Sequence, residues 1–357
     1  MTPREKFFRA VLRQGEGMIP FRLDLCPALT DELERRYGTR DPQTAFDLPI
    51  RYVGLPPTRL HRDFRSCFDM FPENAYTDEW GVGYAPGSVA HFAKFLSPMK
   101  DFTEPGEVWR FPVPDVLADY RWEAVERQVE KIHADGYPAV FSAVQVFEPA
   151  WYLRGLENLL ADMLTDEEMA RACLDRMTGI QKEVAVRAAK TGFDAILYGD
   201  DVATQRAMMM SLSDWEKWLR PTMEICIREA KAVKPDLIAI YHSDGVIYDI
   251  VPQLIEIGVD VLNPVQPECV DPVLLKTQYG DRLSFWGCVG TQTVMPFGTA
   301  EDVRRTVREL AAAVGKGGGL VLAPTHMLEP EVPWENVEAF VSECRRFWET
   351  DSISGKP

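Results

Sequence analysis

His242 and Asp244 are the residues whose types and spacing in this 357-residue chain best suit metal binding or proton transfer. They lie two positions apart, directly after the apolar run 237–241, so on an extended segment both side chains project to the same side. His326 follows a later apolar run, and the three residues together offer ligand types suited to zinc. The pattern leaves two interpretations open: a metal site, or a cluster of hydrogen-bonding and proton-transfer groups.

Asp200 and Asp201 form a second group of candidate catalytic residues, directly after the apolar run 196–198. Two adjacent carboxylates cannot both point into one pocket unless the pKa of one of them rises. We therefore expect one of them to face a pocket, where it would bind a metal, hold a cationic intermediate or accept a proton. The other is expected to cap the next segment of the chain.

Amide and aromatic side chains near the ends of other apolar runs are candidates for substrate binding. Amides donate and accept hydrogen bonds but do little covalent chemistry, so they are predicted to orient a substrate, and aromatic rings are predicted to form an apolar wall. The alternative roles are holding loop backbone and filling the core. The predicted substrate-binding residues are Trp151, Tyr152, Asn263, Gln266, Trp286 and Gln292.

The elements that must position these residues are strands that alternate with helices. Apolar runs of strand length at 139–144, 196–198, 237–241 and 259–265 are separated by helical patterns, which indicates a parallel sheet. No Gly-x-Gly-x-x-Gly joins a strand to a helix, so a Rossmann fold is not favoured. We predict a closed (β/α)8 TIM barrel, a single domain spanning 1–357, with its site at the carboxyl ends of the strands.

The N-terminal part of the chain is less regular. A capping box, Thr2 with Glu5, opens a short helix, and 18–25 is a strand candidate. Residues 41–115 are rich in proline, glycine and aromatic residues and include a hairpin pattern at 77–84. This region is predicted to be an excursion or a lid beside the barrel.

Charge and composition limit the kinds of partner that the chain is expected to bind. A formal net charge of −16 argues against nucleic acid and anionic membranes, which bind basic surfaces. The chain has no apolar stretch of membrane-spanning length and no signal-peptide core near its charged N-terminal helix, so we expect a cytoplasmic protein. The seven cysteines are scattered and never form Cys-x-x-Cys, so they are expected to be free thiols.

Several motifs resemble the uroporphyrinogen decarboxylase superfamily, which includes porphyrinogen decarboxylases and corrinoid- or thiol-linked methyltransferases. The likeness covers nearly the whole chain and implies a (β/α)8 barrel. The motifs are the Thr-Pro-Arg-Glu-Lys-Phe opening, Asp-Glu-Trp-Gly at 78–81, Gly-Asp-Asp at 199–201, His-Ser-Asp-Gly at 242–245, the runs 258–266 and 287–292, and His326.

The resemblance implies different chemistry in the two branches. In the decarboxylases, an essential aspartate and a late histidine would be matched by Asp47 and His326, but their Arg-Gln-Ala-Gly-Arg-Tyr segment is replaced here by residues 21–27. The thiol-methylating branch binds zinc through a His-x-Cys pair and a later Cys. Here Asp244 stands in place of the first cysteine, and the later position falls near His326.

The leading hypothesis from the resemblance is a methyltransferase, the first component of an O-demethylase system. It would pass a methyl group from a small methoxylated or methylated substrate to a corrinoid on a separate protein, since no Asp-x-His-x-x-Gly corrinoid motif occurs in this chain. The expected cofactor is zinc, and the expected partners are the substrate, a corrinoid protein and, in a homodimer, a second copy. The residues predicted to polarise or protonate the leaving oxygen are Asp200, Asp201, His242, Asp244 and His326.

Two alternatives remain. A decarboxylase-like lyase acting on a porphyrinogen or another carboxylated substrate would use Asp47 and His326 to stabilise a cation. A barrel retained as a non-catalytic binding protein is the third interpretation, because a fold alone does not fix function.

Overall fold

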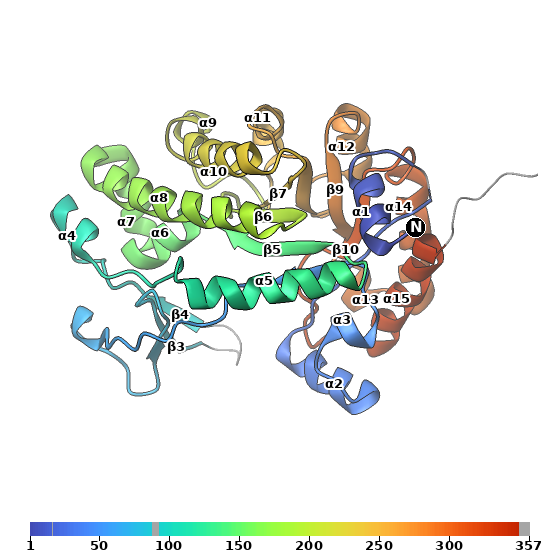
Figure 1. Ribbon diagram of the computed structural model, residues 1–357, viewed down its shortest axis with the longest axis horizontal. Helices are drawn as coiled ribbons and strands as arrows, with labels where there is room; N and C mark the ends of the chain where they lie inside the picture. The colour runs from blue at the N-terminus through green and yellow to red at the C-terminus, as the bar shows by residue number, and fades with distance from the viewer. Residues whose placement is uncertain (16, 88–92, 350–357) are drawn as a thin grey trace, which may run out of the picture.

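A curled parallel sheet of seven strands forms the centre of the computed structural model, which describes residues 1–15, 17–87 and 93–349 (Figure 1). The strand order is β1-β5-β6-β7-β8-β9-β10, and every neighbouring pair is parallel. All carboxyl ends therefore meet at one edge. The strands are β1 (Arg51–Val53), β5 (Ala139–Val144), β6 (Ala195–Gly199), β7 (Ile238–His242), β8 (Val261–Val265), β9 (Ser284–Val289) and β10 (Leu320–Pro324).

Helices cover the outer face of the sheet, with α5, α8 and α10 beside the first strands and α14 and α15 beside the last (Figure 1). The helices are α1 (Pro3–Val11), α2 (Pro27–Tyr37), α3 (Pro42–Ala45), α4 (Pro105–Arg110), α5 (Asp119–Ala134), α6 (Phe147–Arg154), α7 (Leu156–Thr165), α8 (Glu167–Thr191), α9 (Leu212–Asp214), α10 (Arg220–Val233), α11 (Val251–Glu256), α12 (Pro272–Tyr279), α13 (Val294–Phe297), α14 (Ala300–Ala313) and α15 (Trp334–Glu349). Short 3-10 turns lie at η1 (Arg65–Cys67) and η3 (Tyr248–Ile250), and a π turn lies at η2 (Trp215–Leu219).

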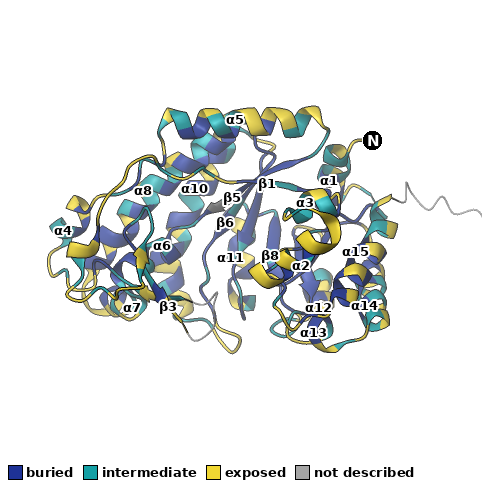
Figure 2. Ribbon diagram, turned by 90° about the horizontal axis from the view of Figure 1, so that it is seen from below, coloured by how far each residue is buried: buried dark blue, intermediate teal, exposed yellow. Residues whose placement is uncertain are grey.

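Both faces of the sheet are buried, as the dark strands of Figure 2 show. Along β7, Ile238 and Ile240 belong to a small cluster inside the curl, while Ala239 and Tyr241 pack in the larger cluster between sheet and helices. Alternate strand residues point to opposite faces, so a strand buried on both faces appears as a continuous apolar run. This explains why the strands were recognisable in the sequence, and the predicted parallel α/β architecture is confirmed.

The predicted strand at 18–25 is not a regular strand. It lies next to β10 through an isolated parallel bridge between Phe21 and Leu322, with a second bridge between Leu25 and Leu328. Pro20 has no N–H to donate, which interrupts a ladder at this point. No bridge joins this segment to β1 in the described part of the chain, so the sheet is a TIM-like curl of seven strands, and the predicted eighth strand and full closure are not established.

The region 41–115 is only partly an excursion, and residues 88–92 within it lie outside the described residues. It contains β1, a member of the central sheet that was missed because three residues are too short to show a period. The predicted hairpin is present, since Tyr76 pairs with Tyr84 and Thr77 with Gly83 in an antiparallel sheet. That sheet consists of β2 (Tyr76–Thr77), β3 (Gly83–Pro86) and β4 (Ala93–Leu96).

The described helices include none that combines the length and the apolar character needed to span a bilayer.

Candidate functional site

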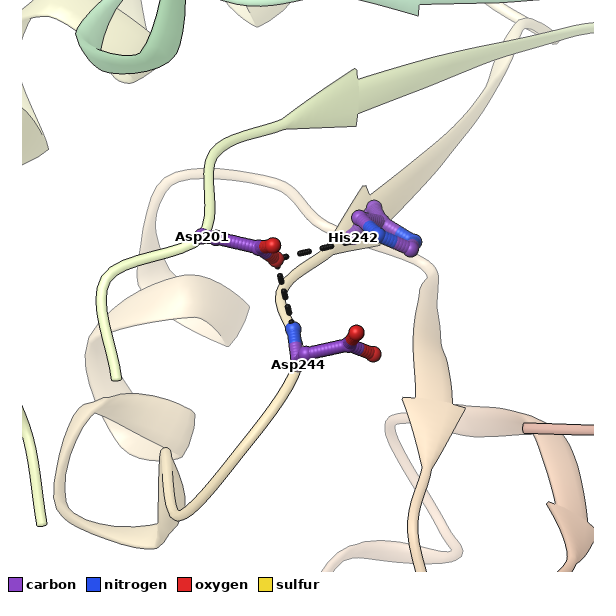
Figure 3. A group of neighbouring side chains, drawn as sticks. All are labelled: Asp201, His242 and Asp244. Carbon is purple, nitrogen blue, oxygen red and sulfur yellow. Dashed lines mark hydrogen bonds and ion pairs between the residues drawn. The ribbon is translucent and has the colours of Figure 1, made fainter. Parts of the chain in front are cut away.

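The carboxyl ends of β6 and β7 bring Asp201, His242 and Asp244 together (Figure 3). Gly199 pairs with His242 across the two strands, so the residues that follow each strand are neighbours. His242 Nε2 lies 3.7 Å from Asp201 Oδ1, which also accepts a 2.7 Å hydrogen bond from the Asp244 backbone N–H. One potential ligand atom from each residue lies within 4.8 Å of the other two, which makes the group a compact candidate cation site.

Asn263 on β8 orients the His242 ring. The distance between His242 Nδ1 and Asn263 Oδ1 is 2.7 Å. With the amide oxygen as acceptor, Nδ1 carries the proton, which leaves the lone pair of a neutral ring on Nε2, the nitrogen nearest Asp201. A metal-binding histidine is commonly held in this way by a partner on its second nitrogen. Asn263 is therefore placed as a positioning residue for His242.

The cluster carries an excess of negative charge. Burial lowers the pKa of His242, but the carboxylates of Asp201 and Asp244 raise it, and the net shift is upward. Burial raises the pKa of Asp244, whose Oδ1 atom is buried and has no hydrogen-bond partner among the described residues. Within the described residues, neither Asp201 nor Asp244 pairs with a lysine or arginine. A bound cation would balance this charge and supply the missing partner of Asp244.

Asp200 and Asp201 have different surroundings, although they are adjacent in sequence. Asp200 is 2% exposed, and its Oδ1 atom accepts hydrogen bonds from the backbone N–H groups of Val146 and Glu148 at 3.0 and 2.9 Å. Burial raises the pKa of Asp200 to about 6. Asp200 thus holds the loop from β5 into α6, whereas Asp201 faces His242.

Replacing Asp200 with alanine is expected to destabilise the fold without removing a cation from the cluster. The substitution leaves two buried N–H groups without an acceptor, which costs about 1–3 kcal/mol each before relaxation. Urea denaturation should show a lower free energy of unfolding for Asp200→Ala, with a smaller loss for Asp200→Asn, which keeps one acceptor oxygen. Loss of bound metal at unchanged stability would contradict this role.

Glu148 is a buried acid that was not selected from the sequence. Its Oε1 atom accepts a hydrogen bond from the Tyr152 hydroxyl at 3.3 Å, and its Oε2 atom lies 3.4 Å from the Asp201 backbone nitrogen, which donates to it. Burial, together with the charges of Asp200 and Asp201, raises the pKa of Glu148 to about 7. The available signal was a lone glutamate among apolar residues directly after a predicted strand.

Two adjoining cavities contain most of the predicted site residues. The first, of about 310 Å³, is lined by Asp201, His242 and Asn263 and has Tyr52 and Trp286 in its wall. This volume is at the small end of the range for ligand pockets. The second, of about 290 Å³, is lined by Gln266 and Gln292 among others.

Asp244 and His326 line both cavities. His326 is exposed, and its Nδ1 atom lies 3.3 Å from the backbone oxygen of Met327. It is not a member of the compact cluster, in which Asp201 lies beside His242 and Asp244, so the His242, Asp244, His326 ligand set remains a prediction. His326 remains close enough to lower the pKa of Asp244 by its charge.

Trp151 and Tyr152 lie on α6 and do not line either of these two cavities. Their rings contact each other at a centroid distance of 4.0 Å, and each contacts Phe95 of β4. Tyr152 lines a separate cavity of about 300 Å³ together with Arg121, and its hydroxyl donates a hydrogen bond to Glu148.

The structure does not bring Asp47 to the site. Asp47 precedes β1, and Tyr137, whose hydroxyl donates to its carboxylate at 2.5 Å, precedes β5. Residues that precede parallel strands lie at the edge opposite the carboxyl ends, so Asp47 is at the wrong end of the sheet. Its side chain is 69% exposed and pairs with Arg51 at 3.0 Å. The structure therefore gives no support to a catalytic role for Asp47 at the cluster of Asp201, His242 and Asp244.

A curled parallel sheet with polar side chains gathered at its carboxyl edge defines an α/β scaffold of the TIM-barrel kind. The sequence pattern of the family described as uroporphyrinogen decarboxylase (URO-D) matches residues 81–347, and the chain belongs to this family. The resemblance inferred from the motifs is thus confirmed.

Solved structures differ in how closely their folds match that of this chain. A methyltransferase from Methanosarcina mazei matches 98% of this chain and 99% of its own with a TM-score of 0.71 at 17% sequence identity, which shows a shared fold. An intracellular xylanase from Thermoanaerobacterium saccharolyticum (TM-score 0.38, 12% identity, 61% of this chain and 80% of that chain) is far less similar. A GH53 catalytic domain from Ignisphaera aggregans is also far less similar (TM-score 0.36, 14% identity, 64% of this chain and 79% of that chain). No curated protein sequence matches the chain.

Proposed function

We propose that this protein is a methyltransferase that moves a methyl group from a small methoxylated substrate to the corrinoid of a separate protein. The observation that carries the proposal is the cluster of Asp201, His242 and Asp244 in the wall of an aromatic-lined cavity at the carboxyl edge of the sheet. Family membership and the fold shared with the Methanosarcina mazei methyltransferase support it.

The three residues fit a zinc ion. One imidazole nitrogen and two carboxylate oxygens are ligand types that zinc accepts in catalytic sites, which combine three protein ligands with an open position. The buried, unpartnered Oδ1 of Asp244 and the oriented Nε2 of His242 are consistent with this assignment. When bound, zinc supplies Lewis acidity that stabilises negative charge on an oxygen leaving group.

The remaining side chains of the first cavity would hold the substrate. Tyr52 and Trp286 contact each other edge to face, with centroids 6.2 Å apart, and offer apolar surface against which a substrate ring could pack. The second cavity meets the first at Asp244 and His326, so it gives a methyl acceptor a separate approach to the same point. In the transfer, the carbon–oxygen bond breaks, the methyl carbon takes an electron pair from Co(I), and the oxygen keeps its bonding pair and then gains a proton.

A decarboxylase-like lyase is the second candidate, and the family match is the observation that favours it. The position of Asp47 counts against the residue pair first considered for that chemistry, because Asp47 and His326 lie at opposite edges of the sheet.

The direct test is methyl transfer from a panel of methoxyaromatic compounds to free cob(I)alamin, followed by absorbance. The zinc-loaded protein is expected to convert Co(I) to methyl-Co(III) with at least one compound, and the apo protein is not. If protein shown to hold one zinc per chain transfers no methyl group from any compound of the panel, the proposal is contradicted. Release of CO2 from a carboxylated compound would favour the lyase.

A further inference from the structure

The cavity of about 300 Å³ that Tyr152 and Arg121 line, here called the outer cavity, takes no part in the proposed chemistry. It is bordered by β5, by the helices α5 and α8 that pack against β5, and by the hairpin of β2 and β3 (Figure 1). Phe141 and Val184 in its wall belong to the larger apolar cluster, which fills the space between sheet and helices. The first cavity instead has walls that belong to the small cluster inside the curl. The outer cavity therefore lies toward the outer face of the sheet.

Gln181, on α8, lines the outer cavity with an amide that forms no hydrogen bond to any described residue. The residue is only 8% exposed, but both polar atoms of the amide keep accessible surface, so a ligand in the cavity can reach them. Ser142, on β5, also lines the cavity, and its hydroxyl likewise has no partner in the described part of the chain. Burying polar groups without partners costs free energy, so both side chains favour a ligand that supplies hydrogen bonds.

The charged residues of the wall are already paired. Asp78 accepts hydrogen bonds from the backbone N–H of Val82 at 2.9 Å and from the Tyr84 hydroxyl at 3.0 Å. Glu79 accepts a hydrogen bond from Arg121 at 2.9 Å. An ionised ligand would lose its hydration here without gaining an opposite charge that is not already paired, which is costly. The chemistry of the outer cavity therefore favours an uncharged ligand.

Aromatic side chains complete the wall of the outer cavity. They are Trp80, Tyr84, Phe141 and Tyr152, which suit packing against a ring, and the volume is that of a small ligand pocket. We infer that the outer cavity is a second ligand site, which binds a small uncharged ring compound carrying an amide-like donor and acceptor. Gln181 recognises this pair, because its own amide offers both a donor and an acceptor.

This inference goes beyond the proposed function and does not depend on it. Among the described residues, the outer cavity shares no lining side chain with the two cavities that contain the cluster of Asp201, His242 and Asp244. Binding in the outer cavity is therefore expected with or without zinc. If methyl transfer were never observed, the inference would stand unchanged.

The test is titration calorimetry on the full chain, with benzamide and its charged isostere benzoate as probes. Benzamide is expected to bind at least tenfold more tightly than benzoate, with the same affinity in zinc-loaded and zinc-free protein. Gln181→Leu should weaken benzamide binding roughly tenfold, because it removes the hydrogen bonds with little change in volume. Gln128→Leu, at an exposed position on α5, is the matched control and should leave the affinity unchanged.

A second variant locates the probe. Val184→Phe fills the outer cavity from α8 and should abolish benzamide binding. If that variant does not fold, Gln181→Leu still decides, since leucine buries no polar group. The inference is overturned if benzamide shows no saturable binding, if benzoate binds as tightly, or if Gln181→Leu leaves the affinity for benzamide unchanged. Binding that requires zinc would place benzamide in the first cavity and would overturn the inference as well.

Discussion

Replacing His242 with alanine is expected to remove zinc from the protein and to abolish methyl transfer. His242 provides the only nitrogen ligand of the described cluster, and its Nε2 atom is oriented by the 2.7 Å contact of Nδ1 with Asn263. Zinc bound by protein ligands is stabilised by roughly 10–16 kcal/mol, so losing one ligand of three should weaken binding on the order of a thousandfold. Elemental analysis after dialysis would measure the zinc content of the variant, and competition with a chromogenic chelator would measure its zinc affinity.

His326→Ala is the matched comparison for this prediction. The sequence predicted His326 as a zinc ligand, whereas the compact cluster of the structure contains Asp201 beside His242 and Asp244. Asp201→Asn should therefore lower zinc affinity strongly, and His326→Ala should keep one zinc per chain. If His326→Ala loses zinc while Asp201→Asn keeps it, the ligand set inferred from the structure is wrong. Full activity of zinc-free protein would remove the metal from the proposal altogether.

Replacing Arg121 with methionine is expected to lower the stability of the protein strongly, because Arg121 pairs with two acidic residues of the region 41–115. Arg121, on α5, is 2% exposed; its Nη2 atom donates to Glu79 at 2.9 Å, and its Nη1 atom lies 3.5 Å from Asp115. Thr58 joins the same network, since its N–H donates to Glu79 and its hydroxyl to Asp115. The network ties three parts of the chain before α5 to that helix.

Removal of the Arg121 guanidinium leaves the carboxylates of Glu79 and Asp115 without their cationic partner, although these side chains are only 23% and 22% exposed. Breaking a buried pair from one side costs about 3–5 kcal/mol, and the partial exposure of the acids favours the lower end. Urea denaturation should show this loss for Arg121→Met, and limited proteolysis should cut within 41–115 more rapidly. Arg127→Met, at an exposed position of the same helix, is the control. Equal stability of the two variants would show that the network does not hold this region.

The fold was predictable because its signals are local. A parallel strand buried on both faces appears as an apolar run, and the capping box of Thr2 and Glu5 marked the start of α1 as the structure has it. Short or interrupted elements were not predicted correctly from the sequence. β1 has three residues, and the segment around Pro20 lies beside β10 with only isolated bridges. Neither gives enough residues for a periodic pattern.

The sequence by itself determined which side chains stand at the carboxyl ends of strands, and hence that Asp201, His242 and Asp244 face one edge. The two-residue spacing also placed His242 and Asp244 on the same side, as Figure 3 shows. These properties depend only on strand direction and on the alternation of side chains along a strand.

Only the tertiary structure decided which of these residues meet. The pairing of Gly199 with His242 sets Asp201 rather than His326 beside the imidazole, and strand polarity puts Asp47 at the opposite edge. Burial of Glu148 likewise depends on neighbours from distant segments. Register and burial arise between strands far apart in the chain, so no local spacing in the sequence encodes them.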